Sequence, residues 1–188
     1  TKALSQDQSF LIPDDAVNGD YVGYIKAYPE HEYVGEPATF KLKSSSSIFE
    51  LSESGLLTVK DADNLAPGKE ELKVIVSREY FANTEITAEK EIVSHSSSKY
   101  VDFSASSNGS GTRLSPYNEF VPESNTVFFL KRGTTRLGGP VSLNDIDNIS
   151  IESYGQGENA TFSCNQLGSA RVLSFNNGCD NVLVSNIN

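Results

Sequence analysis

The sequence predicts an all-β protein in which two β architectures follow one another along the chain. Over residues 10–94, apolar and polar residues alternate in short runs, which places one face of each strand in a core and the other in water. From residue 100 onward, apolar runs recur at long intervals, and DNISIES at 147–153 returns as DNVLVSN 33 residues later. We therefore predict an antiparallel β-sandwich followed by the first coils of a parallel β-helix.

Six alternating runs predict the strands of the sandwich. Turn residues separate them, as in NGD, SESG and LAPGK. Short strands about ten residues apart favour two packed antiparallel sheets over a small α/β domain, because no apolar run keeps a helical period beyond two turns. The predicted strands are 21–28, 38–44, 48–54, 55–61, 71–77 and 85–94.

The order of these segments resembles a cadherin-like domain. The resemblance is carried by FLIPDDAVNGDYVGYIKAY, FELSESGLLTVKDADNL and GKEELKVIVS, and it covers about 85 residues. In the family, these are the opening strand with its acidic-Gly turn, an F-x-L-x-x-x-x-G-x-L-x-V hairpin and a late strand. The resemblance implies a cadherin-like β-sandwich over residues 1–94, located outside the cell or at its surface.

Cadherin repeats usually carry calcium, so the resemblance raises the question of a metal site. The segment YPEHE shifts Glu30 and Glu32 off the family's ligand positions, and KDADN, with Asp61 and Asp63, replaces the family's acidic triplet. Calcium takes six or more oxygen ligands from converging segments. We expect these four carboxylates to be solvated turn residues and predict no cofactor; a calcium site is the alternative.

Two histidines are the remaining candidate metal ligands. His31 and His95 lie in separate segments without a cysteine nearby. A zinc site needs more ligands than these two segments offer. We expect both side chains at the surface.

Residues 95–99 are predicted to link the two domains, because SHSSSK is polar and has no apolar period. Three short strands then fall within each repeat interval, and strands too short to bury a face alone favour stacked parallel coils with Asn and Gly at the corners. An antiparallel arrangement is the alternative, with NNGCDN as a hairpin turn. The predicted strands are 140–143, 148–153, 160–164, 171–175 and 181–188.

The second domain also resembles the N-terminal part of right-handed parallel β-helix proteins of the pectate-lyase kind. The matching segments are YVDFSASSNGSGTRLSPYNEF, NTVFFLKRGTTRL and NISIESYGQGENATFS, about 90 residues together. The resemblance implies that residues 100–188 form the cap and first coils of such a β-helix. Because the chain stops within the strand pattern and contains no methionine, we expect it to be part of a longer protein.

Charged residues gather near the expected first coil. Lys131, Arg132 and Arg136 could form a rim for anionic sugars, with Asp145 and Asp147 beside them. β-helix enzymes of this kind place Asp, Arg or Lys on adjacent coils to cleave acidic polysaccharides. We favour the other interpretation, in which these are turn residues of the cap, and we predict no catalytic residue within the chain.

Two further sets of residues bear on the compartment. Cys164 and Cys179 are a candidate disulfide in an oxidising environment, where the bond would contribute about 3 kcal/mol; in the alternative, Cys164 packs inside the coil. Asn108, Asn148 and Asn159 stand in N-x-S/T sequons, which a chain rich in Ser and Asn can also contain by chance.

Charge narrows the range of partners. The net charge is −10, with 9 basic and 17 acidic residues over 1–94 and 6 and 8 over 95–188. An acidic surface repels phosphate backbones, so no nucleic acid is expected. No apolar run is long enough to span a membrane.

Two functional hypotheses follow. The first is the N-terminal portion of a secreted or cell-surface β-helix protein, a non-catalytic adhesion or spacer module associated with polysaccharide or with another surface protein. The alternative is the N-terminal portion of a polysaccharide lyase or glycoside hydrolase whose active site lies beyond residue 188. A phage tailspike, which would be a trimer, is a third. The sequence leaves open both enzymatic activity and oligomeric state.

Overall fold

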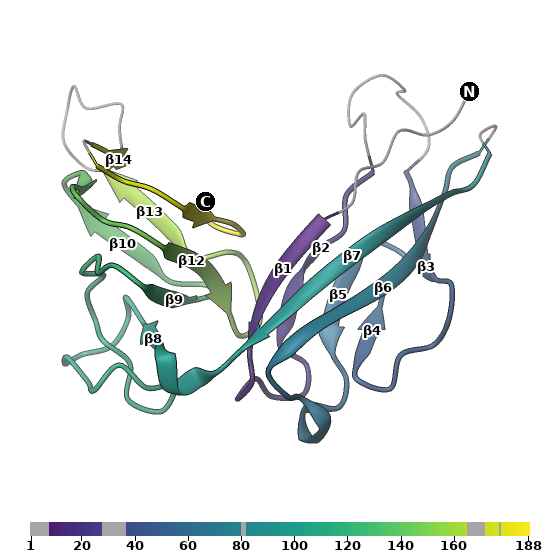
Figure 1. The fold of residues 1–188 in the computed structure, drawn as a ribbon, viewed down its shortest axis with the longest axis horizontal. Coiled ribbons are helices and arrows are strands. Elements are labelled where there is room, and N and C mark those ends of the chain that lie inside the picture. Colours follow the sequence, from purple (N-terminus) through teal and green to yellow (C-terminus); the bar gives the residue numbers. More distant parts are fainter. Residues whose placement is uncertain (1–7, 28–36, 80–81, 165–171, 177) are drawn as a thin grey trace. The chain divides into compact units, whose positions relative to one another are not determined.

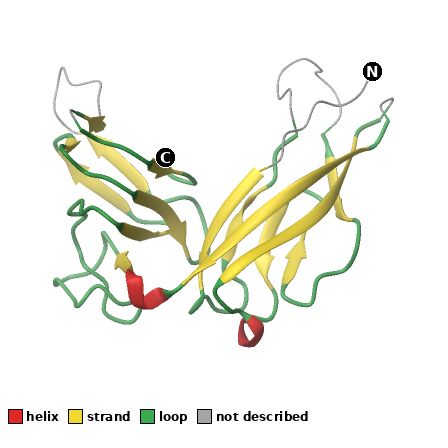
Figure 2. Ribbon diagram, viewed as in Figure 1, coloured by secondary structure: helices red, strands yellow, loops and turns green. Residues whose placement is uncertain are grey.

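The computed structural model describes residues 8–27, 37–79, 82–164, 172–176 and 178–188. These residues form β-strands and two short 3-10 helices, η1 (Ala62–Asn64) and η2 (His95–Ser97), which Figure 2 shows in red. The predicted all-β class is confirmed. The chain divides into two compact units, Thr1–Val93 (unit 1) and Ser94–Asn188 (unit 2). Within the described residues, no helix has the length and apolar character to cross a membrane.

Unit 1 contains two sheets (Figure 1). Strand β1 runs parallel to β7, and the other strand pairs of the unit are antiparallel. The first sheet has the order β1 (Gln8–Pro13), β7 (Thr84–Val93), β6 (Gly68–Ser77), β3 (Thr39–Leu42). The second has the order β2 (Tyr21–Tyr24), β5 (Leu56–Val59), β4 (Phe49–Leu51).

The alternation of residues explains which face of β6 is buried. Leu72, Val74 and Val76 are buried in the core, while Lys69 and Lys73, which point to the other face of the strand, are exposed. On the exposed face, Lys69 forms an ion pair with Glu89 of β7 at 3.2 Å. Apolar side chains of the second sheet complete the core, including Phe49, Leu57 and Val59.

The turn between β4 and β5 requires its glycine. Gly55 has a φ of +92°, and a Cβ atom there would lie 2.5 Å from the carbonyl oxygen of Ile25. Other residues would meet both a strained backbone and a clash. The SESG turn therefore packs closely against the segment that follows β2.

Unit 2 is built from parallel strand pairs. Its main sheet has the order β15 (Val182–Val184), β12 (Ile149–Tyr154), β9 (Thr126–Lys131), β8 (Ser98–Val101). Two further pairs are β10 (Thr135–Gly138) with β13 (Thr161–Cys164), and β11 (Val141–Leu143) with β14 (Leu173–Phe175). All these pairs are parallel, so the antiparallel alternative for this half is wrong.

Each turn of the chain in unit 2 lies in register with the next. Ile149 pairs with Val182, and Val141 pairs with Leu173. Strand β12 has neighbours on both sides and is buried on both faces from Ile151 to Tyr154. Burial on both faces is typical of a central strand in a parallel sheet.

A column of three asparagines marks one corner of unit 2. Asn148 Nδ2 donates to Asn125 Oδ1, and Asn181 Nδ2 donates to Asn148 Oδ1, both at 2.9 Å. The three residues have φ angles of 56°, 52° and 53°, in the left-handed region that asparagine tolerates better than most residues. The repeated Asp-Asn of the sequence contributes two members of this asparagine column, and Asn125 is the third.

The segment predicted as a linker has regular structure. Residues 95–99 form η2 and the first residues of β8, and the Ser97 and Ser98 hydroxyls each donate to the Ser94 carbonyl at 3.0 Å. Serine hydroxyls can satisfy backbone groups in this way, so a Ser-rich composition does not by itself indicate a flexible segment. His95 is exposed, as expected, and His31 lies outside the described residues.

Candidate functional site

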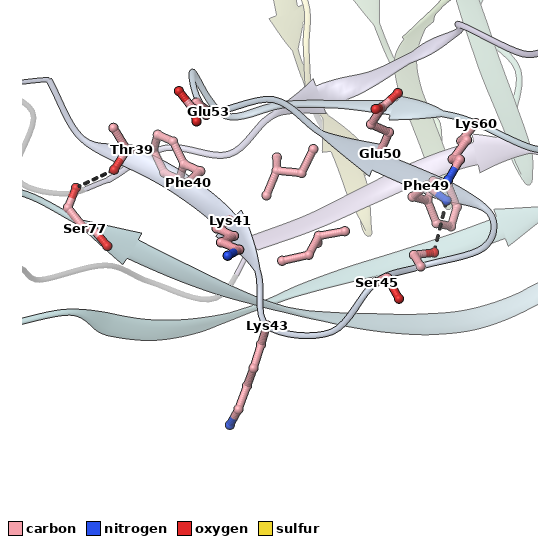
Figure 3. A pocket seen from close by; sticks show the side chains of 13 residues that line it. Thr39, Phe40, Lys41, Lys43, Ser45, Phe49, Glu50, Glu53, Lys60 and Ser77 are labelled. Atoms are coloured by element: carbon pink, nitrogen blue, oxygen red, sulfur yellow. Dashed lines mark hydrogen bonds between the residues drawn. The ribbon is translucent and has the colours of Figure 1, made fainter.

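A hollow of about 720 Å³ opens between β3 and β4, which are edge strands of the two sheets of unit 1 (Figure 3). We call it the edge hollow. Its floor is apolar, and its rim carries both signs of charge. The lining residues are Thr39, Phe40, Lys41, Leu42, Lys43, Ser45, Ser46, Phe49, Glu50, Leu51, Glu53, Lys60 and Ser77.

Local hydrogen bonds fix the floor of the edge hollow. The Phe40 amide donates to the Glu53 carbonyl at 3.1 Å, which joins β3 to the β4–β5 turn. The Phe49 amide donates to Ser46 Oγ at 3.0 Å, so the serine loop holds the start of β4. Both phenylalanines are buried, and they therefore give the hollow a preformed apolar base.

The charged side chains stand around this floor. Lys43 points away from Phe40 and Phe49 in Figure 3, and its Nζ forms an ion pair with Glu85 of β7 at 2.6 Å. Lys41, Lys60 and Glu50 remain at the rim. The edge hollow thus combines an apolar floor with hydroxyl, ammonium and carboxylate groups at its rim.

Lys90 lies in the core beside Phe49. It is 0% exposed, and its Nζ lies 4.8 Å from the centroid of the Phe49 ring. Burial lowers its pKa to about 8, and the charges of Glu70 and Glu71 partly oppose this. Glu70 stands opposite Lys90 in the β6–β7 pairing. Lys90 was not among the predicted site residues, although alternation along β7 places it on one face with Ala88 and Ile92.

A second hollow, of about 470 Å³, lies within unit 2, and we call it the cap hollow. Lys131 Nζ donates to Asp102 Oδ2 at 2.6 Å, and the Arg113 guanidinium carbon lies 5.1 Å from the Tyr154 ring centroid. Burial alone would raise the pKa of Asp102, but hydrogen bonds from Lys131 and Ser104 hold it below its ordinary value. The hollow thus combines a carboxylate with cations.

The predicted basic trio does not converge on one place. Lys131 and Arg132 line the cap hollow, whereas Arg136 is not among the residues that line it. Arg132 is buried, and its Nη1 donates to Asn159 Oδ1 and to the Gly157 carbonyl. Arg136 Nη1 donates to the Gly139 carbonyl at 2.8 Å. Arg132 and Arg136 thus form hydrogen bonds with turn residues of unit 2.

The predicted acidic pair also lies in turns. Asp147 Oδ1 accepts a hydrogen bond from the Asp180 amide at 3.0 Å, so it ties one turn of the chain to the next. Asp145 has a φ of 53°, and a Cβ atom on Gly178 would lie 2.6 Å from its Oδ1. Both carboxylates therefore have contacts that shape the corners of unit 2.

Glu152 is the most deeply buried acid among the described residues of unit 2, and no sequence pattern indicated it. It is 0% exposed; its Oε1 accepts from the Ser153 amide at 2.9 Å, and its Oε2 is hydrogen-bonded to the Ser185 hydroxyl. Burial raises its pKa to about 7, opposed by hydrogen bonds from Ser185, Ser153 and Asn186 and by the charge of Arg132. In an alternating pattern with Ile149 and Ile151, this position is expected to face solvent, so the sequence carried no signal of its burial.

The candidate calcium ligands are only partly within the described residues. Glu30 and Glu32 lie outside them. Asp61 precedes η1, and its Oδ2 accepts from Asn64 Nδ2 at 2.8 Å, while Asp63 is exposed. In the part of the chain that the structure describes, no three His, Cys, Asp or Glu side chains are placed to hold a metal ion. The absence of a calcium site stays a prediction.

Both cysteines are free thiols in the structure. Cys164 ends β13 opposite Gly138. Cys179 follows β14, and its Sγ donates to the Leu143 carbonyl at 3.3 Å. The two sulfurs thus belong to different corners, one before and one after β14.

Comparison with known proteins gives a partial likeness. Neither a protein family nor a curated protein matches the chain. Among solved structures, the third cadherin domain of human protocadherin 7 has a TM-score of 0.42 at 12% identity, covering 50% of this chain and 87% of that one. Chicken VE-cadherin EC1-2 has a TM-score of 0.39 at 14% identity, covering 49% of each chain. Protocadherin gammaB7 EC3-6 has a TM-score of 0.41 at 17% identity, with coverage of 50% and 23%.

Proposed function

We propose that the chain is a non-catalytic adhesion or spacer module of the cell exterior. In this proposal unit 1 is a cadherin-like sandwich, and unit 2 forms the first coils of a right-handed parallel β-helix. The edge hollow is its contact surface for another cell-surface protein or for polysaccharide.

The path of the chain through unit 1 carries the proposal. Strands β1 and β7 lie side by side (Figure 1), and in this parallel pair Gln8 is the partner of Ala88 and Pro13 the partner of Val93. The described chain therefore begins at one end of this strand pair and leaves unit 1 about 17 Å away, at the other end. We expect a module with this path to extend a tandem chain, because β1 begins and β7 ends at opposite ends of their strand pair.

The regular register of unit 2 supports the spacer interpretation. Each turn of a parallel coil adds about 4.8 Å along the stacking direction. The asparagine column and the three sets of parallel pairs repeat the same contacts from turn to turn. We assign the right hand because connections between parallel strands of one sheet have that hand in nearly all proteins.

Bead clustering tests the proposed function. Beads that carry the whole chain are mixed with one another and with beads coated in acidic polysaccharide, and clustering is expected in one of these arms. The double variant Lys41→Glu, Lys60→Glu reverses charge at the rim of the edge hollow and should abolish clustering. The matched control Lys69→Glu, Lys73→Glu changes exposed residues of β6 and should retain it. No clustering in either arm, or equal loss in both variants, contradicts the proposal.

The cap hollow favours a second candidate function, a polysaccharide lyase or hydrolase whose site lies in unit 2 rather than beyond residue 188. It places Asp102 beside Lys131 and Arg113, and a carboxylate next to cations is a combination that acid–base chemistry on an anionic sugar can use. Release of shortened chains from acidic polysaccharide, abolished by Lys131→Ala, would establish this alternative in place of the first.

A further inference from the structure

The three sequons of unit 2 differ in how their amide groups are used. Attachment of a glycan requires an asparagine Nδ2 that a transferase can reach, and a fold that accommodates a sugar on that nitrogen. Asn108, Asn148 and Asn159 can therefore be compared by their contacts.

Asn148 is the middle member of the asparagine column. Its Nδ2 donates to Asn125, and its Oδ1 accepts from Asn181, so both ends of the amide are engaged. A sugar on Nδ2 would crowd the column and compete with the contact to Asn125. The fold of unit 2 therefore disfavours a glycan here, although the side chain is exposed.

Asn159 is half-buried and engaged at both ends of its amide. Its Oδ1 accepts from the buried Arg132, which fixes the orientation of the amide, and its Nδ2 faces Asn188 Oδ1 at 3.5 Å. A sugar on this nitrogen would have to displace Asn188, whose backbone amide donates to the Ala160 carbonyl at 3.0 Å. This position is also disfavoured.

Asn108 has the opposite arrangement. It is exposed, and its Oδ1 accepts from the Asn118 amide at 3.2 Å. Within the described part of the chain, its Nδ2 donates no hydrogen bond. The following Gly109 donates its amide to the Pro116 carbonyl at 3.0 Å, so the loop is anchored while the Asn108 nitrogen stays available.

A small hollow adjoins Asn108. It has a volume of about 240 Å³, and Asn108, Tyr117, Val121 and Phe128 are among its lining residues. Val121 is 67% exposed. The first sugar of a glycan on Asn108 would have apolar surface to cover at this place.

We propose that Asn108 is the N-glycosylation site of this chain and that Asn148 and Asn159 remain unmodified. The donor is a lipid-pyrophosphate-linked oligosaccharide. A bond forms between Nδ2 and C1 of the first sugar, the bond from C1 to the pyrophosphate oxygen breaks, the lipid pyrophosphate leaves as an anion, and Nδ2 loses one proton. The inference rests on the proposed extracellular function, because the transfer takes place in the secretory pathway.

The test is expression of the whole chain behind a heterologous signal sequence in eukaryotic cells. Intact mass before and after peptide N-glycosidase treatment is measured on secreted and retained chain alike. We expect one glycan, lost in both Asn108→Gln and Ser110→Ala and retained in Asn159→Gln. A glycan that persists in Asn108→Gln, or an unmodified wild-type chain, overturns the proposal.

Two controls keep the outcomes separate. Circular dichroism melting of Asn108→Gln checks that loss of the glycan does not reflect misfolding, and Ser110→Ala removes the sequon without changing Asn108. Bead clustering with unglycosylated chain from bacteria tests the proposed adhesion independently, so either proposal can fail alone.

Discussion

The two units each bury an ionisable side chain, and they do so differently. Lys90 of unit 1 lies in the sandwich core, where Phe49 gives its ammonium group a ring face and the described residues offer its Nζ no hydrogen bond. Glu152 of unit 2 accepts hydrogen bonds from its own strand and from Ser185, 33 residues further along. Because successive turns of unit 2 lie in register, the next turn supplies a polar partner. The two sheets of unit 1 share one interior of mainly apolar side chains.

The opposite charges of these groups give opposite responses to pH. A raised carboxyl pKa means that the folded state binds more protons than the unfolded state between the two pKa values, so stability falls as pH rises. A lowered ammonium pKa means that the unfolded state binds more protons in that window, so stability rises with pH. Hydrogen exchange at amides of β12 and β7 can follow the two units separately.

The largest expected effect is the pH response of Glu152. Because its pKa is raised from 4.5 to about 7, the contribution of Glu152 to the stability of unit 2 should be complete below pH 4.5 and be lost as pH rises through 7. The expected loss is about 3 kcal/mol. Glu152→Gln should remove this dependence when exchange of β12 amides is measured across the window. Glu158→Gln, at an exposed turn, is the control and should keep it; a flat wild-type profile would refute the assignment.

The next effect is the cost of burying Lys90. Lys90→Met replaces a buried cation with an apolar chain of similar length and should stabilise unit 1 by about 1–2 kcal/mol at neutral pH. Because its pKa is lowered to about 8, wild-type stability should rise between pH 8 and 10.5, and the variant should lack that rise. Lys73→Met, on the exposed face of β6, should change stability by less than about 0.5 kcal/mol. Destabilisation by Lys90→Met would show that the ammonium group has a stabilising partner.

A smaller effect is expected in the asparagine column. Asn148→Ala removes two side-chain hydrogen bonds and places alanine at a φ of 52°, which together should cost unit 2 about 1–2 kcal/mol. Asn148→Gly removes the same bonds but tolerates the angle, so it should cost less. Thermal unfolding of the pair separates backbone strain from hydrogen bonding. Equal losses of stability in the two variants would show that the side-chain hydrogen bonds of the asparagine column account for the whole effect.

Local patterns in the sequence predicted most of unit 1, and non-local packing limited the rest. Alternation located β6, β7 and the hairpin, and the same alternation could have identified Lys90 as inward-facing. Alternation could not identify Glu152 as buried, because its burial depends on a segment 33 residues further along the chain, which includes Ser185. The Asp-Asn repeat indicated Asn148 and Asn181 as equivalent positions, but Asn125 follows a serine, so the stacking of all three side chains was not predicted. The edge hollow had no signal, because it depends on how two sheets meet.

Calcium removal should have almost no effect on either unit. The Asp61 carboxylate accepts a hydrogen bond from Asn64, and the Asp63 side chain is exposed, so we do not expect either to be a calcium ligand. A native-state ligand raises stability with its concentration. Addition of EDTA should therefore shift the melting temperature by less than a few degrees, and a larger shift would mean that Glu30 and Glu32 complete a site with these residues.

The smallest effect is expected from the cysteines. Cys164 pairs with Gly138 at one end of the β10–β13 pair, while Cys179 contacts the carbonyl of Leu143, the last residue of β11. A disulfide needs Cα atoms about 6 Å apart. Strand β14 separates the two cysteines along the chain, and their partners Gly138 and Leu143 belong to different strands, β10 and β11, so we expect the two Cα atoms to lie too far apart for a bond. Thiol titration of the denatured, unreduced chain should count two thiols, and reducing agent should leave the melting temperature unchanged. A count of zero would show that the oxidised protein rearranges this corner to form the bond.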